Sequence, residues 1–269
     1  MSDVSRSEYQ ESVSKLWGAG GHGYDDISFM VSDALAHAAQ RLQAAEGESV
    51  LDVATGTGWT ARNLARSGAR VSAIDLSEEL LAGAKELSKH IAPAIDFRYA
   101  DAQELPFEDG SFDAVASTFG VIFAPEQARA ARELARVCRR GGRLCLLTWP
   151  EGFLNEFWAI TAKYSSTPPQ GPAPTLWGDP QHVESLLGEF FDLSFEEGIN
   201  RSYHPDGEQI ARLYEQGFGP VTELRASLDE EHRNELHADL VAFHETEALR
   251  TDAGLRMERP YLLVLGTRR

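Results

Sequence analysis

Cysteine is scarce in this chain, which has two such residues among 269. Cys138 comes at the end of a predicted helix and Cys145 lies within an apolar strand, so neither has the spacing of a metal site. His232, His237 and His244 fall on a charged helical stretch that also lacks a recognisable ligand spacing. The sequence therefore predicts no metal site, and we expect both cysteines to be reduced, buried packing residues.

Basic residues are outnumbered, with 25 Lys and Arg against 42 Asp and Glu, which gives a formal net charge of -17. Such a surface repels a phosphate backbone, so we expect no nucleic-acid partner. Acid-rich surfaces keep a protein in solution, and this is the simpler explanation of the charge. Attraction of a cationic substrate is the alternative.

Long hydrophobic runs are missing too. The first residues, MSDVSRSEYQESVSKLW, are polar and lack the apolar stretch of a secretory signal. No later segment approaches the roughly 20 apolar residues of a membrane-spanning helix. We therefore expect a cytoplasmic protein without a membrane span, and the sequence does not indicate its oligomeric state.

Short apolar strands alternate with helical patterns between Ser49 and Trp149. This alternation indicates repeated βαβ units and a parallel sheet, and hence an α/β fold. The predicted strands cover 49–54, 70–75, 95–100, 112–118 and 143–149. Ser77 is predicted to cap a helix with acids in its first turn. Gly141 and Gly142 are predicted to end the helix that precedes the fifth strand.

Outside this core the sequence contains mainly helical patterns and no clean linker. We interpret 1–269 as a single domain, with an N-terminal helical cover at 1–48 and a cofactor-binding core at 49–150. Substrate-side helices, a Pro/Gly-rich loop at 165–179 and a strand at 190–195 are predicted within 151–258. A final strand is predicted within 259–269.

A glycine turn at the end of the first strand is the strongest local signal. Asp52-Val53-Ala54-Thr55-Gly56-Thr57-Gly58 precedes a predicted helix. Glycine lets the backbone pass close to a ligand, and a helix N-terminus offers free N–H groups to an anion. Many strand-turn-helix units hold a glycine for geometry alone, so the motif needs support from other residues.

Acids at the ends of the next two strands supply that support. Asp75 follows the glycine turn by about 20 residues, where a carboxylate accepts the hydroxyls of a ribose in dinucleotide-binding folds. Asp101 ends the third strand, where an acid can accept the amino group of adenine. Ligands of open α/β sheets bind at the carboxyl ends of the strands, so the three positions together predict a nucleoside site.

The residues of this core resemble the class I S-adenosylmethionine-dependent methyltransferases, particularly the branch similar to the ubiquinone and menaquinone methyltransferases. The resemblance covers about residues 48–150 and is carried by VLDVATGTG, VSAIDLS, DAQELPFEDGSFDAV, STFGVIFAPE and RELARVCRRGGRLCLLTWP. It implies a Rossmann-like, seven-stranded, mostly parallel sheet with helices on both faces and an antiparallel C-terminal strand. It also implies a helical cover over the active site.

The same resemblance implies a methyl donor, S-adenosyl-L-methionine, with S-adenosyl-L-homocysteine as the product. By this likeness Asp52, Ala54, Gly56 and Gly58 line the methionine end, and Thr118 and Phe119 border the transferred methyl group. The full predicted cofactor-binding set is Asp52, Ala54, Gly56, Thr57, Gly58, Asp75, Leu76, Asp101, Ala102, Thr118 and Phe119. Ala54 stands where the family has its first glycine.

Methyl transfer needs no dedicated catalytic side chain, because the reaction is an in-line displacement. A hydroxyl or thiol acceptor would benefit from a base, and the candidates are His22, Tyr24 and His204, with Tyr203 beside the last. We expect the acceptor to be a small molecule, either quinone-like or a secondary metabolite. The sequence names neither the acceptor nor the atom that is methylated.

Two alternative functions remain open at this point. Gly56, Gly58 and Ala61 also satisfy the dinucleotide fingerprint of an NAD(P)-dependent oxidoreductase, although that fingerprint gives no role to Asp52 or Asp101. A non-catalytic, methyltransferase-like binding module is the second alternative.

Overall fold

The strands of the structure occur in the alternating order that the sequence predicts. The computed structural model describes residues 7–165 and 171–269. Within these ranges one sheet is formed by β1 (Ser49–Val53), β2 (Arg70–Asp75), β3 (Asp96–Tyr99), β4 (Phe112–Thr118), β5 (Cys138–Thr148), β6 (Phe191–His204), β7 (Leu249–Thr251) and β8 (Gly254–Arg268).

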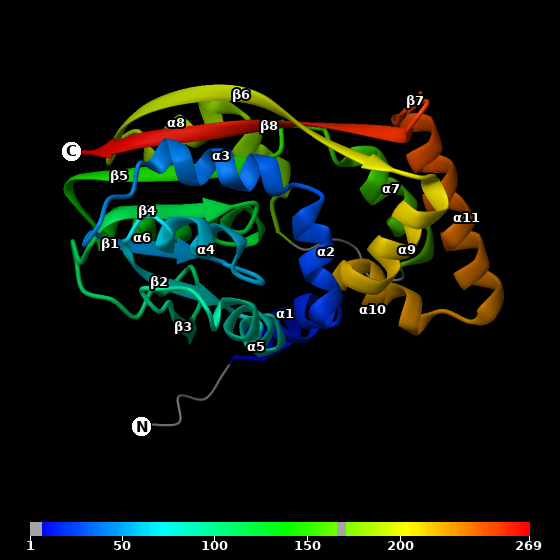
Figure 1. Cartoon of the computed structure of the whole chain (residues 1–269), viewed down its shortest axis with the longest axis horizontal. Helices are drawn as coiled ribbons and strands as arrows, with labels where there is room; N and C mark the ends of the chain where they lie inside the picture. The colour runs from blue at the N-terminus through cyan, green and yellow to red at the C-terminus, as the bar shows by residue number, and fades with distance from the viewer. Residues whose placement is uncertain (1–6, 166–170) are drawn as a thin grey trace.

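Helices connect and cover these strands (Figure 1). The α-helices are α1 (Glu8–Gly18), α2 (Tyr24–Phe29), α3 (Ser32–Leu42), α4 (Trp59–Ala65), α5 (Glu78–Ser88), α6 (Gln127–Val137), α7 (Asn155–Tyr164), α8 (Pro180–Leu187), α9 (Gly207–Gly217), α10 (Gly219–Ser227) and α11 (Glu230–Glu247). Three short 3-10 helices accompany them in the described ranges, namely η1 (Gly21–Gly23), η2 (Val121–Phe123) and η3 (Pro174–Gly178).

The strand order is β3-β2-β1-β4-β5-β8-β6. Strands β1 to β5 pair in parallel, whereas β8 is antiparallel to both β5 and β6. This confirms the predicted seven-stranded, mostly parallel sheet with an antiparallel C-terminal strand. The short β7 is an eighth strand, which pairs with β8 beside the main order.

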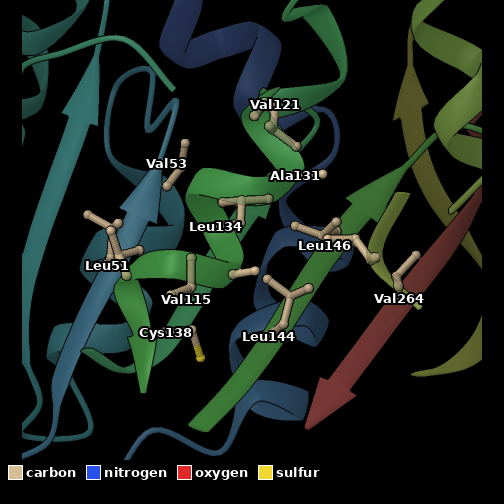
Figure 2. Close-up of a cluster of buried hydrophobic side chains, with 14 of the residues drawn as sticks. Leu51, Val53, Val115, Val121, Ala131, Leu134, Cys138, Leu144, Leu146 and Val264 are labelled. Carbon is tan, nitrogen blue, oxygen red and sulfur yellow. The ribbon is translucent and has the colours of Figure 1, made fainter. Parts of the chain in front are cut away.

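Burial on both faces explains why the central strands lack alternation. Leu144 and Leu146 of β5 pack with α6 and α8 on one face, in the cluster of Figure 2. Cys145 and Leu147 pack with α3 and α4 on the other face. Both cysteines are free and buried, as predicted, and burial raises the pKa of Cys145 to about 12.

Some element boundaries differ from the predicted ones. Helix α6 ends at Val137, before Gly141 and Gly142, because the next residue, Cys138, already pairs with Phe112 of β4. The two glycines lie within β5, where the register of its pairing with β4 shifts. Strands β6 and β8 are much longer than predicted, since they pair with each other from Phe191 to His204. The outer part of β6 is polar, so its sequence lacks the apolar pattern of a buried strand.

A second group of helices gathers beyond the carboxyl ends of β1 and β4 (Figure 1). Helices α7, α9, α10 and α11 share a small core around Phe157, Ala211, Val221, Leu236 and Leu240. The extended parts of β6 and β8 reach this group, and α1 and α2 lie between it and the sheet. This is the predicted helical cover. In the described residues no helix is both long and apolar enough to cross a membrane.

Candidate active site

The glycine turn follows β1 and carries an unusual backbone conformation. Ala54, Gly56 and Gly58 all have positive φ, at 56°, 55° and 84°. The Thr55 amide donates to the Ile74 carbonyl at 2.8 Å, which ties the turn to β2. Gly58 is the N-cap of α4, so the first N–H groups of that helix lie directly behind the turn.

Asp75 connects the end of β2 to this turn. One of its oxygens accepts from the Gly56 amide at 2.8 Å and the other from the Ser77 amide at 2.9 Å. Ser77 in turn caps α5, as predicted. Burial raises the pKa of Asp75, although backbone hydrogen bonds from Ser77, Gly56 and Leu76 act in the opposite direction. A carboxylate has about four lone-pair sites, so Asp75 retains the capacity to accept from a ligand.

Asp52 is fully buried beside the same turn. Its Oδ2 accepts from the Thr55 hydroxyl at 2.6 Å, while its Oδ1 forms no hydrogen bond of normal geometry among the described residues, although the Ala61 amide of α4 lies near the carboxylate. Burial raises the pKa of Asp52 to about 7, against the lowering effect of the Thr55 hydrogen bond. A buried carboxylate with an unused oxygen fits a ligand that carries a cationic, N–H-bearing group.

Asp101 lies at the end of β3, next to β2 in the sheet. Its Oδ1 accepts from the Gln103 amide at 2.9 Å, and its Oδ2 lies 3.4 Å from Gln10 Nε2 of α1. Tyr9 of the same helix is near enough that burial and then the Asp101 charge raise its pKa to about 12. Helix α1 thus covers the third strand end.

Helix α2 covers the glycine turn itself. A Cβ added to Gly56 would lie 3.1 Å from the Tyr24 ring, so this ring rests directly on the turn. Asp25 accepts from the Thr57 hydroxyl at 2.8 Å and pairs with Arg62 of α4 at 3.3 Å. These contacts hold the N-terminal segment against the strand ends.

A cavity of about 150 Å³ extends from the turn toward the helical cover. Ala54, Gly56, Thr118 and Phe119 line its sheet end. Many of its other lining residues are aromatic and come from α1, α7, α11, the segment after β5 and the junction of α9 and α10: Trp17, Trp149, Phe157, Trp158, Phe218 and Phe243. Phe119 stacks on Trp149 with ring centroids 3.9 Å apart, and Trp149 continues the stack to Phe153 at 5.4 Å.

The predicted cofactor residues fall into two groups. Ala54, Gly56, Thr118 and Phe119 line the cavity. The others lie behind or beside it: Asp52, Thr57, Gly58 and Asp75 at the glycine turn, and Leu76, Asp101 and Ala102 at the ends of β2 and β3. The structure brings the ends of three neighbouring strands together under α1 and α2, and only the first of these ends opens onto the cavity.

Of the predicted bases, only Tyr24 lines the cavity. Burial and then the Asp75 charge raise the pKa of Tyr24 far above its ordinary value, so its phenol stays protonated at neutral pH. His22 is exposed on η1, which packs against α5, and it does not line the cavity. His204 is buried at the end of β6 beside Ser202, also outside the lining.

Two polar residues that the sequence pattern did not single out line the cavity instead. They are Arg259 of β8 and His244 of α11, for which the sequence pattern indicated no metal-ligand spacing. His244 follows the apolar run Leu240-Val241-Ala242-Phe243, and this is the one sequence signal of its burial. Among the described residues no group of three or more His, Cys, Asp or Glu side chains is arranged to hold a metal ion.

The comparisons with known proteins agree with this geometry. A family model described as a methyltransferase domain matches residues 51–146, the segment that includes the glycine turn, Asp75 and Asp101. An uncharacterized protein of Mycobacterium tuberculosis is 45% identical over 188 residues, or 68% of each chain.

The chain is also similar to two proteins described as methyltransferases. A demethylmenaquinone methyltransferase of Paenarthrobacter aurescens is 29% identical over 211 residues, which cover 70% of this chain and 79% of that protein. A phosphoethanolamine N-methyltransferase of Haemonchus contortus, solved with S-adenosylhomocysteine, shares the fold with a TM-score of 0.56 at 17% identity. It aligns over 87% of this chain and 52% of that one.

The NAD(P)-dependent oxidoreductase alternative is not supported, because residues 51–146 match a methyltransferase domain. This segment contains Asp52 and Asp101, for which the dinucleotide fingerprint has no role. The sheet order, the glycine turn and the family match point to the same donor and the same type of reaction. The chain belongs to the class I S-adenosylmethionine-dependent methyltransferases.

Proposed function

We propose that this enzyme methylates a small, largely apolar molecule that binds in the aromatic cavity. The observation that carries the proposal is the position of the cavity, whose sheet end is formed by Ala54, Gly56, Thr118 and Phe119. An acceptor among the aromatic rings would therefore lie next to the methyl-donor site. Apolar walls with few polar groups are typical of small-molecule pockets.

The cofactor would be held by the three strand ends. Asp52 offers its unused oxygen to the cationic end of the methionine moiety, and Asp75 and Asp101 offer acceptors to the ribose and the adenine. Tyr24 and Gln10 lie over these groups, so binding requires α1 and α2 to adjust. When bound, S-adenosylmethionine would supply a methyl group on a sulfonium, so that an in-line nucleophile of the acceptor could take the methyl carbon and S-adenosylhomocysteine would leave as the thioether.

The protein would assist this displacement by orienting the acceptor and by keeping water away from the reacting atoms. The stacked rings of Phe119, Trp149 and Phe153 form a flat wall along which a planar acceptor would lie. The apolar part of the cavity would exclude water from the reacting atoms, and holding donor and acceptor in a fixed geometry would remove the entropic cost of bringing them together during the reaction. We propose that residues 49–150 bind the donor and that 1–48 and 151–258 enclose the acceptor, within one domain that ends with the 259–269 strand.

The net charge of -17 disfavours nucleic acid as the acceptor. A quinone-like compound or a secondary metabolite agrees with the aromatic wall, and the named Paenarthrobacter relative acts on a demethylmenaquinone by its description.

Thermal unfolding with added ligand tests the proposal directly. S-adenosylhomocysteine at about 100 times its dissociation constant should stabilise the native state by about 2.7 kcal/mol, because it binds only the folded protein. NADH at the same concentration is the control and should leave the melting temperature unchanged. Stabilisation by NADH alone would reverse the assignment. No response to either ligand would favour a non-catalytic module.

Acceptors can then be sought with deuterated S-adenosylmethionine and a panel of quinols, phenols and amines. A mass increase of the CD₃ group in one class identifies the acceptor, and transfer to the protein itself or to added RNA would contradict a small-molecule function.

A further inference from the structure

The wall of the cavity opposite the strand ends contains two buried side chains with unused polar atoms. His244 is 1% exposed and Arg259 is 5% exposed, and both line the cavity. Neither imidazole nitrogen of His244 nor the Nη2 of Arg259 has a hydrogen-bond partner among the described residues. A buried polar group without a partner destabilises the folded protein, so these atoms indicate a ligand that supplies the missing partners.

Both side chains are held in place by neighbours that leave those atoms unused. Arg259 donates through Nη1 to the Ser202 hydroxyl at 2.9 Å, and His204 contacts the same hydroxyl at 3.0 Å. The His244 ring stacks on Tyr214, with centroids 5.1 Å apart and an interplanar angle of 27°. Arg259 is therefore anchored at one nitrogen and His244 at its ring face.

The charges of the two groups differ. Burial, and then the charges of Arg259 and His204, lower the pKa of His244 to about 3, so its imidazole is neutral. A neutral imidazole offers one N–H donor and one acceptor nitrogen. The guanidinium of Arg259 is always charged and only donates. Together they present one charged donor, one neutral donor and one acceptor.

The described carboxylates do not neutralise Arg259. In the described ranges no Asp or Glu oxygen lies within 4.0 Å of its guanidinium. Glu258 lines the same cavity but pairs with Arg201 at 2.9 Å and with Arg256 at 3.1 Å. Glu247 also lines the cavity, but it is exposed and its charge is screened by solvent.

A buried arginine without a carboxylate partner, in a protein of net charge -17, selects for a negative ligand. The aromatic rings around it select for a flat apolar body, and Trp158 adds an indole N–H that has no partner among the described residues. An apolar cavity of about 150 Å³ is large enough to hold an aromatic ring.

Building on the function proposed above, we propose that His244 and Arg259 form the acceptor subsite and select a small aromatic acceptor that carries an acidic oxygen. The charged guanidinium would bind the oxygen anion of a carboxylate or a phenolate. The imidazole would bind a neighbouring hydroxyl or carbonyl group. The two residues determine specificity and orientation, and the reacting atom lies at the other end of the acceptor, toward Thr118 and Phe119.

Ligand-observed fluorine NMR with three matched probes tests this subsite. The probes are 4-fluorobenzoate, 4-fluorophenol and 4-fluorotoluene, each titrated into the full-length protein saturated with S-adenosylhomocysteine. We expect one of the two oxygen-bearing probes to bind at least about tenfold more tightly than 4-fluorotoluene, which corresponds to about 1.4 kcal/mol. The stronger of the two identifies a carboxylate or a hydroxyl as the preferred group.

Two variants examine the residues themselves. Arg259→Met removes the charge at a similar length, and His244→Phe keeps a flat ring between Tyr214 and Phe243. Each should reduce the preference over 4-fluorotoluene to a few-fold or less. His244→Phe should also raise the melting temperature, because it removes two unpartnered buried nitrogens. His182→Phe is the control, since His182 lies on α8 and contacts Gln127 outside the cavity.

The outcomes separate this proposal from the general function. If the wild-type protein binds S-adenosylhomocysteine but binds all three probes equally, the subsite is wrong and the methyltransferase function stands. An unchanged preference in both variants would also overturn it. If S-adenosylhomocysteine itself fails to bind, the proposed function fails first.

Discussion

The Asp75 carboxylate accepts a hydrogen bond of 2.8 Å from the Gly56 amide, which joins the end of β2 to the glycine turn of β1. The glycine turn and the acid at the end of β2, which lie 19 residues apart in the sequence, are therefore joined in the fold. Because the two residues are in contact, a substitution of Asp75 tests the donor site directly.

Asp75→Ala should weaken the binding of S-adenosylhomocysteine by about 2–3 kcal/mol, the range for hydrogen bonds to a charged group. It should also lower the melting temperature, because the amides of Gly56 and Ser77 lose their acceptor. Calorimetry measures the first effect and thermal unfolding the second. Asp96→Ala at the opposite end of β3 is the control and should keep full affinity. Wild-type affinity in the Asp75 variant removes this residue from the site.

Asp52 should make the free protein less stable as the pH rises. The folded-state pKa is about 7, above the ordinary value near 4, so the native state is favoured fully below pH 4. That advantage is lost as the pH rises to about 7. Asp52→Asn cannot ionise and should therefore be more stable than the wild-type protein at pH 8, by roughly 2–4 kcal/mol. Its affinity for S-adenosylhomocysteine should fall.

Asp113→Asn is the control, because the pKa of Asp113 is lowered whereas that of Asp52 is raised. Arg139 and then the Ser49 amide lower the pKa of Asp113, so its contribution is present at neutral pH and is lost as the pH falls. Denaturant unfolding at pH 5 to 8 should separate the two variants, because in this range the destabilisation by Asp113→Asn stays constant while the stabilisation by Asp52→Asn increases with pH. Equal pH profiles for Asp52→Asn and the wild-type protein would show that Asp52 is not ionising in the folded core.

Tyr24 should act as a cover and not as a base. Its phenol stays protonated at neutral pH, and its ring rests on Gly56. Tyr24→Ala should therefore accelerate the association of S-adenosylhomocysteine several-fold, while Tyr24→Phe, which keeps the ring, should match the wild-type rate. Stopped-flow tryptophan fluorescence can follow this, since Trp17 contacts Tyr24. Loss of methyl transfer by 10²–10⁴-fold in Tyr24→Phe would instead identify a general base.

Ala54→Gly should stabilise the protein by about 1 kcal/mol. Ala54 has a φ of 56°, a conformation that costs an L-residue with a Cβ about 1–2 kcal/mol and costs glycine nothing. Ala73→Gly is the control, because Ala73 lies within β2 and glycine weakens a regular strand. Denaturant midpoints should move in opposite directions for the two variants. A loss of stability in both would contradict the left-handed backbone at Ala54.

Much of the fold follows from local sequence patterns. The strands β1, β2 and β4 begin at the predicted residues because apolar β-branched runs follow turn residues there. The outer halves of β6 and β8 were not predictable in the same way. They are polar, and they form strands because each provides the backbone partners of the other.

The amino-acid sequence by itself determined the alternating core, the glycine turn and the acids at three strand ends, because these depend on residues that are close along the chain. Only the tertiary structure decided which side chains surround the aromatic cavity. His244 and Arg259 come from a helix and a strand outside the core pattern. Their unused polar atoms matter only because packing removes them from water, and such burial is set by contacts between distant segments.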